Sequence, residues 1–150
     1  MSMNVADILE NEGKVIFSED EIEDVVAYLY GQLNDCKIIA FSGPLGAGKT
    51  TLIRALLHKC GIKKPVTSPT FIYVNRYINE DGKVFYHFDL YRIESLFDFL
   101  DAGFDEYFYE PNSWCFIEWP EIIKSVLPSG TCSIMLNYHN DRRELQIKKL

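Results

Sequence analysis

Residues 43–50 read Gly43-Pro44-Leu45-Gly46-Ala47-Gly48-Lys49-Thr50, a complete G-x-x-x-x-G-K-T phosphate-binding loop. Triphosphate oxygens need several backbone N–H donors that converge on one point. A glycine-rich turn that leads into a helix N-terminus supplies these donors, because glycine places no Cβ atom in the way. In such a loop Lys49 would reach the β- and γ-phosphates, and the Thr50 hydroxyl would bind Mg²⁺. With glycine at about 7% of residues, the pattern recurs by chance only about once in tens of thousands of windows, so it predicts a nucleotide site.

The segments on either side of this loop match the elements that it requires. Residues 37–41, Lys-Ile-Ile-Ala-Phe, form a short apolar run of the kind that fills a strand buried on both faces. After the loop, Leu52, Ala55 and Leu56 mark one stripe of a helix that ends near Gly61. Strand, loop and helix therefore follow in the order of a P-loop nucleotide-binding unit.

The rest of the chain predicts further helices and strands, with no internal repeat and no linker. Ser18-Glu19-Asp20-Glu21 has the pattern of a capping box, and we expect an amphipathic helix over about residues 19–34. The β-rich runs 71–78 and 83–90 flank a turn at 79–82 and predict a hairpin. Shorter signals predict an edge strand at 15–17, a helix at 94–102, a buried strand at 115–117, a short helix ending near 126, and a strand pair at 132–138 and 144–149. We therefore expect one domain over residues 1–150.

The composition bounds the class of protein. At 47% hydrophobic and 25% charged residues it is that of an ordinary globular domain. No apolar run approaches the roughly 20 residues of a membrane span, and residues 1–13 do not resemble a secretory signal, so we expect a cytoplasmic protein without a membrane partner. The net charge of −7 argues against tight unaided binding to nucleic acid, which needs lysine and arginine to neutralise phosphates. The widely spaced Cys36, Cys60, Cys115 and Cys132 predict neither a zinc site nor disulfides.

Two strand-end carboxylates are candidates to complete a metal site with Thr50, because Mg²⁺ keeps near-octahedral oxygen coordination and Thr50 alone does not satisfy it. Asp89 ends the run 84–88 and Glu118 ends the run 115–117, and strand-end residues line the sites of α/β proteins. Glu118 could instead polarise an attacking water, and the sequence does not separate that role from metal binding. We read the nearby His87 as a strand residue close to the site.

Two further residues lie where a nucleotide could meet them. Thr70, in Ser68-Pro69-Thr70, follows the loop by about twenty residues, where P-loop proteins often place a segment that senses the γ-phosphate. The alternative is an ordinary Ser-Pro turn. Trp119 follows Glu118 directly and would pack near the nucleotide, on a partner or in the core.

Four blocks in this order resemble the successive signatures of the TsaE family. They are residues 43–51, Ser68-Pro69-Thr70-Phe71, the run Tyr86-His87-Phe88-Asp89-Leu90-Tyr91-Arg92, and Ile117-Glu118-Trp119-Pro120. The family comprises small bacterial ATPases required for threonylcarbamoyl modification of the adenosine beside the tRNA anticodon. The resemblance implies a three-layer α/β fold, namely a P-loop NTPase-like mixed sheet with a parallel core and antiparallel strands, flanked by helices.

Carried over residue by residue, the resemblance also implies cofactors, partners and site residues. ATP and Mg²⁺ are the expected cofactors, and slow hydrolysis would depend on a complex of TsaD and TsaB. The chain would reach tRNA only through that complex. We expect the chain alone to be a monomer. The resemblance implies roles for Lys49, Thr50, Thr51, Glu118 and Asp89. Together with the residues argued above, the expected catalytic residues are Lys49, Glu118, Asp89 and Thr70, and the expected metal-associated residues are Thr50, Glu118 and Asp89. The expected nucleotide-binding residues are Gly43, Leu45, Gly46, Ala47, Gly48, Lys49, Thr50, Thr51 and Trp119.

The sequence departs from the family pattern in two places. Many members carry an acidic residue where this chain has Pro44, and residues 94–112 match loosely. Since Pro44 precedes the N–H groups that would cradle phosphate, we expect it to tune the loop without abolishing binding.

Two other functions use the same loop. A P-loop kinase for a nucleoside or small metabolite would need an arginine-bearing lid, and the five arginines cluster only at Arg142-Arg143. A non-catalytic adapter that binds ATP and signals by loop order would share every residue with a slow ATPase. A GTPase is disfavoured because no N-K-x-D guanine motif occurs.

Overall fold

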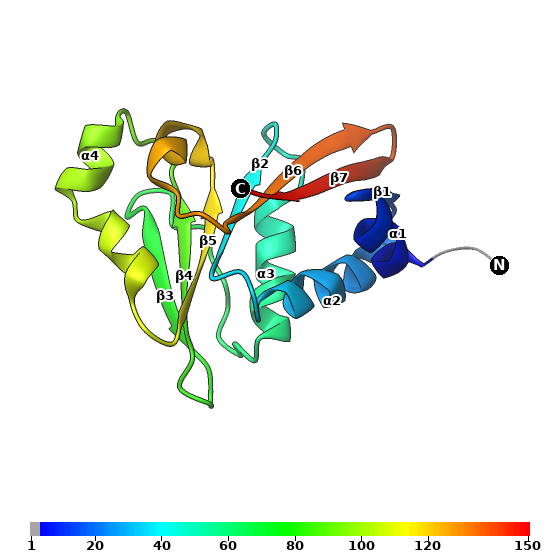
Figure 1. Ribbon diagram of the computed structural model, residues 1–150, viewed down its shortest axis with the longest axis horizontal. Coiled ribbons are helices and arrows are strands. Elements are labelled where there is room, and N and C mark those ends of the chain that lie inside the picture. The colour runs from blue at the N-terminus through cyan, green and yellow to red at the C-terminus, as the bar shows by residue number, and fades with distance from the viewer. Residues whose placement is uncertain (1–3) are drawn as a thin grey trace.

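The computed structural model describes residues 4–150, in which seven strands form one mixed sheet in the order β1-β7-β6-β2-β5-β4-β3 (Figure 1). The inner strands β6, β2, β5 and β4 pair in parallel, and the pairs β3–β4, β6–β7 and β1–β7 are antiparallel. This confirms the predicted parallel core with antiparallel strands at its edges. The strands are β1 (Lys14–Phe17), β2 (Ile38–Ser42), β3 (Val74–Ile78), β4 (Val84–Asp89), β5 (Ser113–Glu118), β6 (Cys132–His139) and β7 (Arg142–Lys149).

Helices cover both faces of the sheet, as the three-layer prediction requires. One hydrophobic cluster joins α1 (Val5–Glu12), α2 (Ile22–Gln32) and α3 (Lys49–Lys59) to one face of the strands. A second cluster joins α4 (Leu96–Asp101) and the 3₁₀ segments η2 (Phe104–Tyr109) and η3 (Pro120–Val126) to the other face. In Figure 1, α1 and α2 lie at the opposite end of the molecule from α4. No helix of residues 4–150 is long and apolar enough to cross a membrane.

Strand alternation assigns each residue of β4 and β5 to one of these layers. Phe85 and Phe116 pack in the cluster with α3, whereas Tyr86 and Cys115 pack in the opposite cluster. Because successive side chains point to opposite faces, the even spacing from Phe85 carries the side chains of His87 and Asp89 to the α3 side. The sheet therefore presents its polar strand-end residues toward the helix that follows the glycine-rich loop.

Local signals place most element boundaries where the sequence predicts them. The capping box is present, since Glu21 Oε1 accepts hydrogen bonds from the backbone N–H and hydroxyl of Ser18, but the predicted helix begins as a 3₁₀ turn, η1 (Glu19–Glu21), before α2. One boundary differs more. The strand expected from Phe71 begins only at Val74, because Tyr73 has a φ of +68° and its N–H bonds the carbonyl of Pro69 in a turn.

The expectation that all four cysteines are unpaired is wrong for Cys36 and Cys132, which form a disulfide. The parallel pairing of β2 with β6 sets Ile39 opposite Cys132, and this register brings Cys36, just before β2, beside the first residue of β6. A pairing across 96 residues of sequence depends on strand order, which cysteine spacing does not reveal. Cys60 and Cys115 are free, and burial raises the pKa of both thiols to about 12.

The first residue of the glycine-rich loop packs against the C-terminal hairpin. Gly43 has a φ of +145°, and a Cβ at this position would collide with the carbonyl oxygen of Leu136 in β6. Strain and overpacking should together lower the free energy of unfolding of Gly43→Ala by roughly 2–5 kcal/mol. Urea denaturation measures this loss.

Gly31→Ala is the matched control. Gly31 lies in α2, and no described atom lies within 4 Å of the site of its added Cβ, so alanine should raise stability by up to about 1 kcal/mol. Equal stability of the two variants would contradict the close approach of Gly43 to β6.

Candidate functional site

The parallel strands β2, β5 and β4 end at the same edge of the sheet, and predicted site residues lie at or just after these strand ends. β2 ends at Ser42, and residues 43–48 then turn into the N-terminus of α3 at Lys49. In the strand register Glu118 at the end of β5 lies opposite Phe41 in β2 and Asp89 in β4. The two carboxylates predicted from sequence therefore meet beside the phosphate-binding loop.

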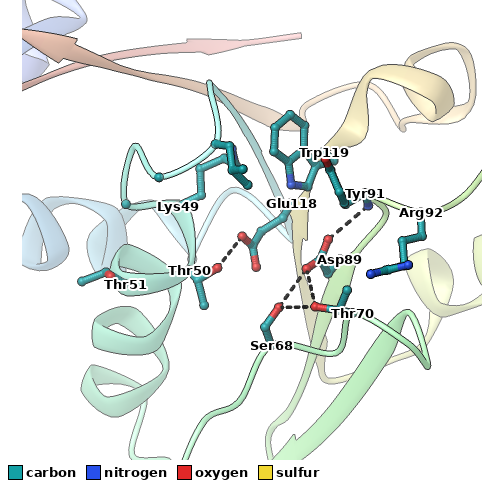
Figure 2. Close-up of a pocket in the computed structure, with 13 residues that line it drawn as sticks. Lys49, Thr50, Thr51, Ser68, Thr70, Asp89, Tyr91, Arg92, Glu118 and Trp119 are labelled. Carbon is teal, nitrogen blue, oxygen red and sulfur yellow. Dashed lines mark hydrogen bonds between the residues drawn. The ribbon is translucent and has the colours of Figure 1, made fainter.

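These residues line a cavity of about 430 Å³ (Figure 2). It contains every residue predicted for catalysis, metal association or nucleotide binding except Gly43 and Ala47. The carbonyl of Gly43 accepts a hydrogen bond from Nζ of Lys49, and Ala47 lines an adjoining cavity of about 290 Å³. The lining residues of the larger cavity are Leu45, Gly46, Gly48, Lys49, Thr50, Thr51, Ser68, Thr70, Asp89, Tyr91, Arg92, Glu118 and Trp119.

The ammonium group of Lys49 is held by its own loop. Nζ donates to the carbonyl oxygens of Gly43 at 2.5 Å and Pro44 at 3.1 Å, and it lies 3.6 Å from the centre of the Trp119 ring. Burial lowers the pKa of Lys49 below its ordinary value, and the negative charges of Glu118, Glu121 and Asp89 oppose that shift. A buried cation held only by carbonyls and an aromatic face is suited to an anionic ligand.

The carboxylate of Glu118 joins the loop helix to the sheet. Its Oε1 accepts a 2.6 Å hydrogen bond from the Thr50 hydroxyl, and its Oε2 lies 2.6 Å from Nε2 of His87. Both Glu118 and His87 are buried. Since Glu118 and Thr50 come from different elements, their contact places a carboxylate and a hydroxyl on one side of the cavity, a donor set that suits a hard divalent cation.

Asp89 organises a second set of hydroxyl groups. Its Oδ2 accepts bonds from Ser68 at 2.8 Å and from Thr70 at 3.4 Å, and its Oδ1 accepts the N–H of Tyr91 at 3.1 Å (Figure 2). Ser68 and Thr70 lie 3.2 Å apart, within hydrogen-bond distance of each other. The structure thus connects the segment that carries Thr70 to the strand end at Asp89, and Ser68, Thr70 and Asp89 all line the cavity.

Trp119 lies in the cavity wall. Its backbone adopts a φ of +58°, a conformation that costs a bulky residue about 1–3 kcal/mol. The centre of the indole lies 5.0 Å from the centre of the Tyr91 ring, and the Lys49 ammonium group lies 3.6 Å from the indole centre. Trp119 thus lies beside the loop and also packs against the second hydrophobic cluster, and its contact with a nucleotide stays a prediction.

The C-terminal hairpin of β6 and β7 contacts the glycine-rich loop through two hydrogen bonds that the sequence did not reveal. The Tyr138 hydroxyl donates to the carbonyl of Leu45 at 2.7 Å, and Nε of Arg143 donates to the carbonyl of Ala47 at 3.0 Å. Arg143 also lies over the Tyr138 ring, with its guanidinium carbon 4.8 Å from the ring centre. No local pattern could indicate these contacts, because they depend on β6 lying beside β2.

His87 and Ser68 are functional candidates that sequence reasoning undervalued. The sequence predicts His87 only as a strand residue near the site, and Ser68 only as part of the segment with Thr70, which is either a sensor of the γ-phosphate or an ordinary turn. For His87 a signal was available, because it lies two residues before Asp89 and therefore on the same face of the strand. A polar residue on that face of an otherwise apolar buried run is costly unless it has a partner.

Comparison with known proteins adds an independent finding. The family described as "Threonylcarbamoyl adenosine biosynthesis protein TsaE" matches residues 16–145. A Haemophilus influenzae protein named "tRNA threonylcarbamoyladenosine biosynthesis protein TsaE" is 38% identical over 73% of this chain and 68% of its own length. A protein of the same name from Treponema pallidum is 38% identical over 77% of this chain and 84% of its own length. The crystal structure of Bacillus subtilis YdiB matches with a TM-score of 0.69 and 28% identity, covering 89% of this chain and 82% of that one.

The contact between hairpin and loop generates a test. Tyr138→Phe removes the donor to the Leu45 carbonyl, and a hydrogen bond of this kind contributes about 0.5–1.5 kcal/mol. Amide hydrogen exchange at Leu45, Gly46 and Ala47 should therefore rise roughly 2- to 10-fold. Tyr109→Phe, at an exposed tyrosine, is the control and should leave the loop unchanged. Unaltered exchange in Tyr138→Phe would show that the hairpin does not restrain the loop.

Proposed function

This chain belongs to the TsaE family, and from that membership we propose that it is a magnesium-dependent ATPase that supports threonylcarbamoylation of the adenosine beside the tRNA anticodon. We propose further that it acts with TsaD and TsaB, and that it reaches tRNA through them. The observation that carries the ATPase proposal is the contact of Thr50 with Glu118, at 2.6 Å, beside the buried ammonium of Lys49.

The residues around the loop fit a magnesium nucleotide. Gly48 is the N-cap of α3 and has a φ of +103°, a backbone conformation that is strained for any residue with a side chain. The positive N-terminal end of the α3 dipole faces the cavity, where it would favour an anion. Lys49 supplies a cation for phosphate, and Thr50 and Glu118 supply oxygen atoms for a hard metal ion. When bound, Mg²⁺ would neutralise negative charge on the phosphate oxygens.

The adjoining cavity suits the base and ribose. It shares Gly46, Gly48 and Thr51 with the larger cavity and continues to the apolar side chains of Phe17 and Ile22. An adenine ring has apolar faces and a polar edge, and Glu19 and Arg142 lie in the same wall. We propose this cavity as the source of base specificity.

In this proposal each of the site residues has a separate role in ATP hydrolysis. Lys49 exchanges the carbonyls of Gly43 and Pro44 for phosphate oxygens. Thr50 would hold the metal ion, and Glu118 would either help to hold it or orient the attacking water. Asp89 keeps Ser68 and Thr70 directed at the cavity, where their hydroxyls can meet the terminal phosphate. Trp119 covers the lysine and limits the access of water.

ATP turnover tests the proposal and separates it from the alternatives. Phosphate release should be slow for the chain alone and should rise when TsaD, TsaB and tRNA are added. A phosphorylated nucleoside or metabolite would indicate a kinase instead, and binding without release under every condition would indicate an adapter. Glu118→Gln should keep the affinity for ATP without Mg²⁺ within about threefold of the wild type, and with Mg²⁺ it should lose at least about 100-fold in turnover. Glu23→Gln, an exposed change on α2, is the control, and wild-type turnover in Glu118→Gln would contradict the role of the carboxylate.

Trp119 provides a direct signal of binding. If Lys49 leaves its carbonyl contacts for phosphate, the environment of the indole changes and its fluorescence should change with it. Trp114→Phe removes the second of the two tryptophans and isolates that signal. In this background magnesium ATP should shift the emission of Trp119, and the added change Lys49→Ala should weaken ATP affinity at least about 10-fold. Undiminished affinity without the lysine would exclude the loop as the phosphate site.

A further inference from the structure

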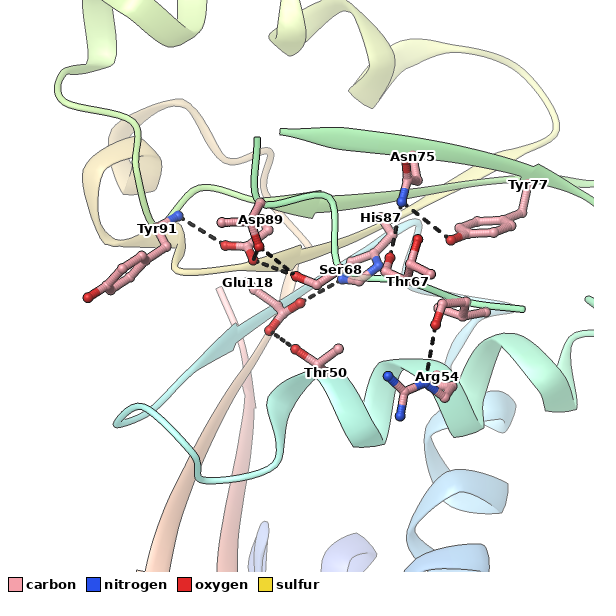
Figure 3. A network of polar contacts seen from close by, with 12 residues as sticks. Thr50, Arg54, Thr67, Ser68, Asn75, Tyr77, His87, Asp89, Tyr91 and Glu118 are labelled. Carbon is pink, nitrogen blue, oxygen red and sulfur yellow. Dashed lines mark hydrogen bonds and ion pairs between the residues drawn. The ribbon is translucent and has the colours of Figure 1, made fainter. Parts of the chain in front are cut away.

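His87 occupies a position that the sheet otherwise fills with apolar groups. It lies in β4, where the last five residues are all buried, and its side chain is 0% exposed. Figure 3 shows its ring reaching toward Glu118, between the hydroxyl network around Asp89 and the contacts of Asn75. The ring therefore contacts Glu118 but does not line the cavity.

The two ring nitrogens of His87 have different surroundings. Nε2 lies 2.6 Å from Oε2 of Glu118. Nδ1 is buried and has no hydrogen-bond partner among residues 4–150. An unpartnered buried polar atom costs about 1–3 kcal/mol, a cost that leucine would avoid. Packing alone therefore does not account for histidine here, and the contact through Nε2 does.

That contact fixes the orientation of the Glu118 carboxylate. Oε1 accepts the hydroxyl hydrogen of Thr50, and Oε2 faces His87, so each oxygen has one neighbour from a different element. Without a donor at Nε2, Oε2 would be buried and unpaired, and the carboxylate could rotate away from Thr50. The orientation in which Oε1 meets the loop helix therefore depends on the histidine.

We propose that His87 is a positioning residue, which donates the N–H of Nε2 to Glu118 and holds this carboxylate ready for a magnesium nucleotide. The proposal rests on the function proposed above. Residues that orient a metal-associated ligand typically contribute 10- to 100-fold to metal affinity or activity. His87 does not line the cavity, so it acts only through Glu118.

The amide side chains offer matched variants. The Nε2 atom of glutamine lies about as far from the backbone as Nε2 of histidine, whereas the amide nitrogen of asparagine reaches only as far as Nδ1. His87→Gln therefore keeps a donor for Glu118, His87→Asn keeps a polar amide without reaching it, and His87→Leu removes the donor while filling the space.

Calorimetry with a slowly hydrolysed ATP analogue tests the proposal apart from turnover. Without Mg²⁺ all three variants should bind the analogue within about twofold of the wild type. The tightening that Mg²⁺ brings should fall about 10- to 100-fold in His87→Asn and His87→Leu and persist within about threefold in His87→Gln. Equal loss in all three variants, or full Mg²⁺ tightening in His87→Leu, would overturn the proposal.

A second measurement needs neither ligand nor variant. Long-range ¹H–¹⁵N correlation spectra of the wild-type protein should show a proton on Nε2 of His87. A ring that carries its only proton on Nδ1 could not donate to Glu118 and would overturn the proposal. Failure of the wild type to bind the ATP analogue would contradict the proposed function instead, and the spectrum would still test the contact between His87 and Glu118.

Discussion

The carboxylate of Glu118 is the group on which the site depends, because it is bound from both sides by residues of different elements. Thr50 begins α3, His87 lies in β4, and Glu118 ends β5. Their meeting requires parallel strands whose carboxyl ends reach the same edge, and a register that sets Glu118 opposite both Phe41 and Asp89. A buried carboxylate is costly without partners, and these two contacts offset that cost.

Contacts within the chain hold the loop beside Glu118 in shape. Hairpin side chains fix its outer carbonyls through Tyr138 and Arg143, and Lys49 satisfies two inner carbonyls. Such preorganisation reduces the ordering that a ligand must pay for on binding. In the proposed function Lys49 exchanges these carbonyls for phosphate oxygens, so ATP binding would change the environment of Trp119.

The sequence predicted what local patterns determine. The phosphate-binding loop, the capping box at Ser18 and the strand ends at Asp89 and Glu118 all occur as expected, since each depends on neighbours within a few residues. It did not predict what strand order determines. The disulfide of Cys36 with Cys132, the contacts of Tyr138 and Arg143 with the loop, and the partner of His87 all require knowing which strands are adjacent. The roles of the individual site residues in binding and hydrolysis stay predictions.

A crystal structure with a non-hydrolysable ATP analogue and Mn²⁺ in place of Mg²⁺ tests this account most directly, because Mn²⁺ can be located by its anomalous scattering. We expect the triphosphate on residues 43–50, the Lys49 ammonium on its oxygens, and the metal beside Thr50 on the side that faces Glu118. A triphosphate bound elsewhere, or a metal remote from both Thr50 and Glu118, would contradict it.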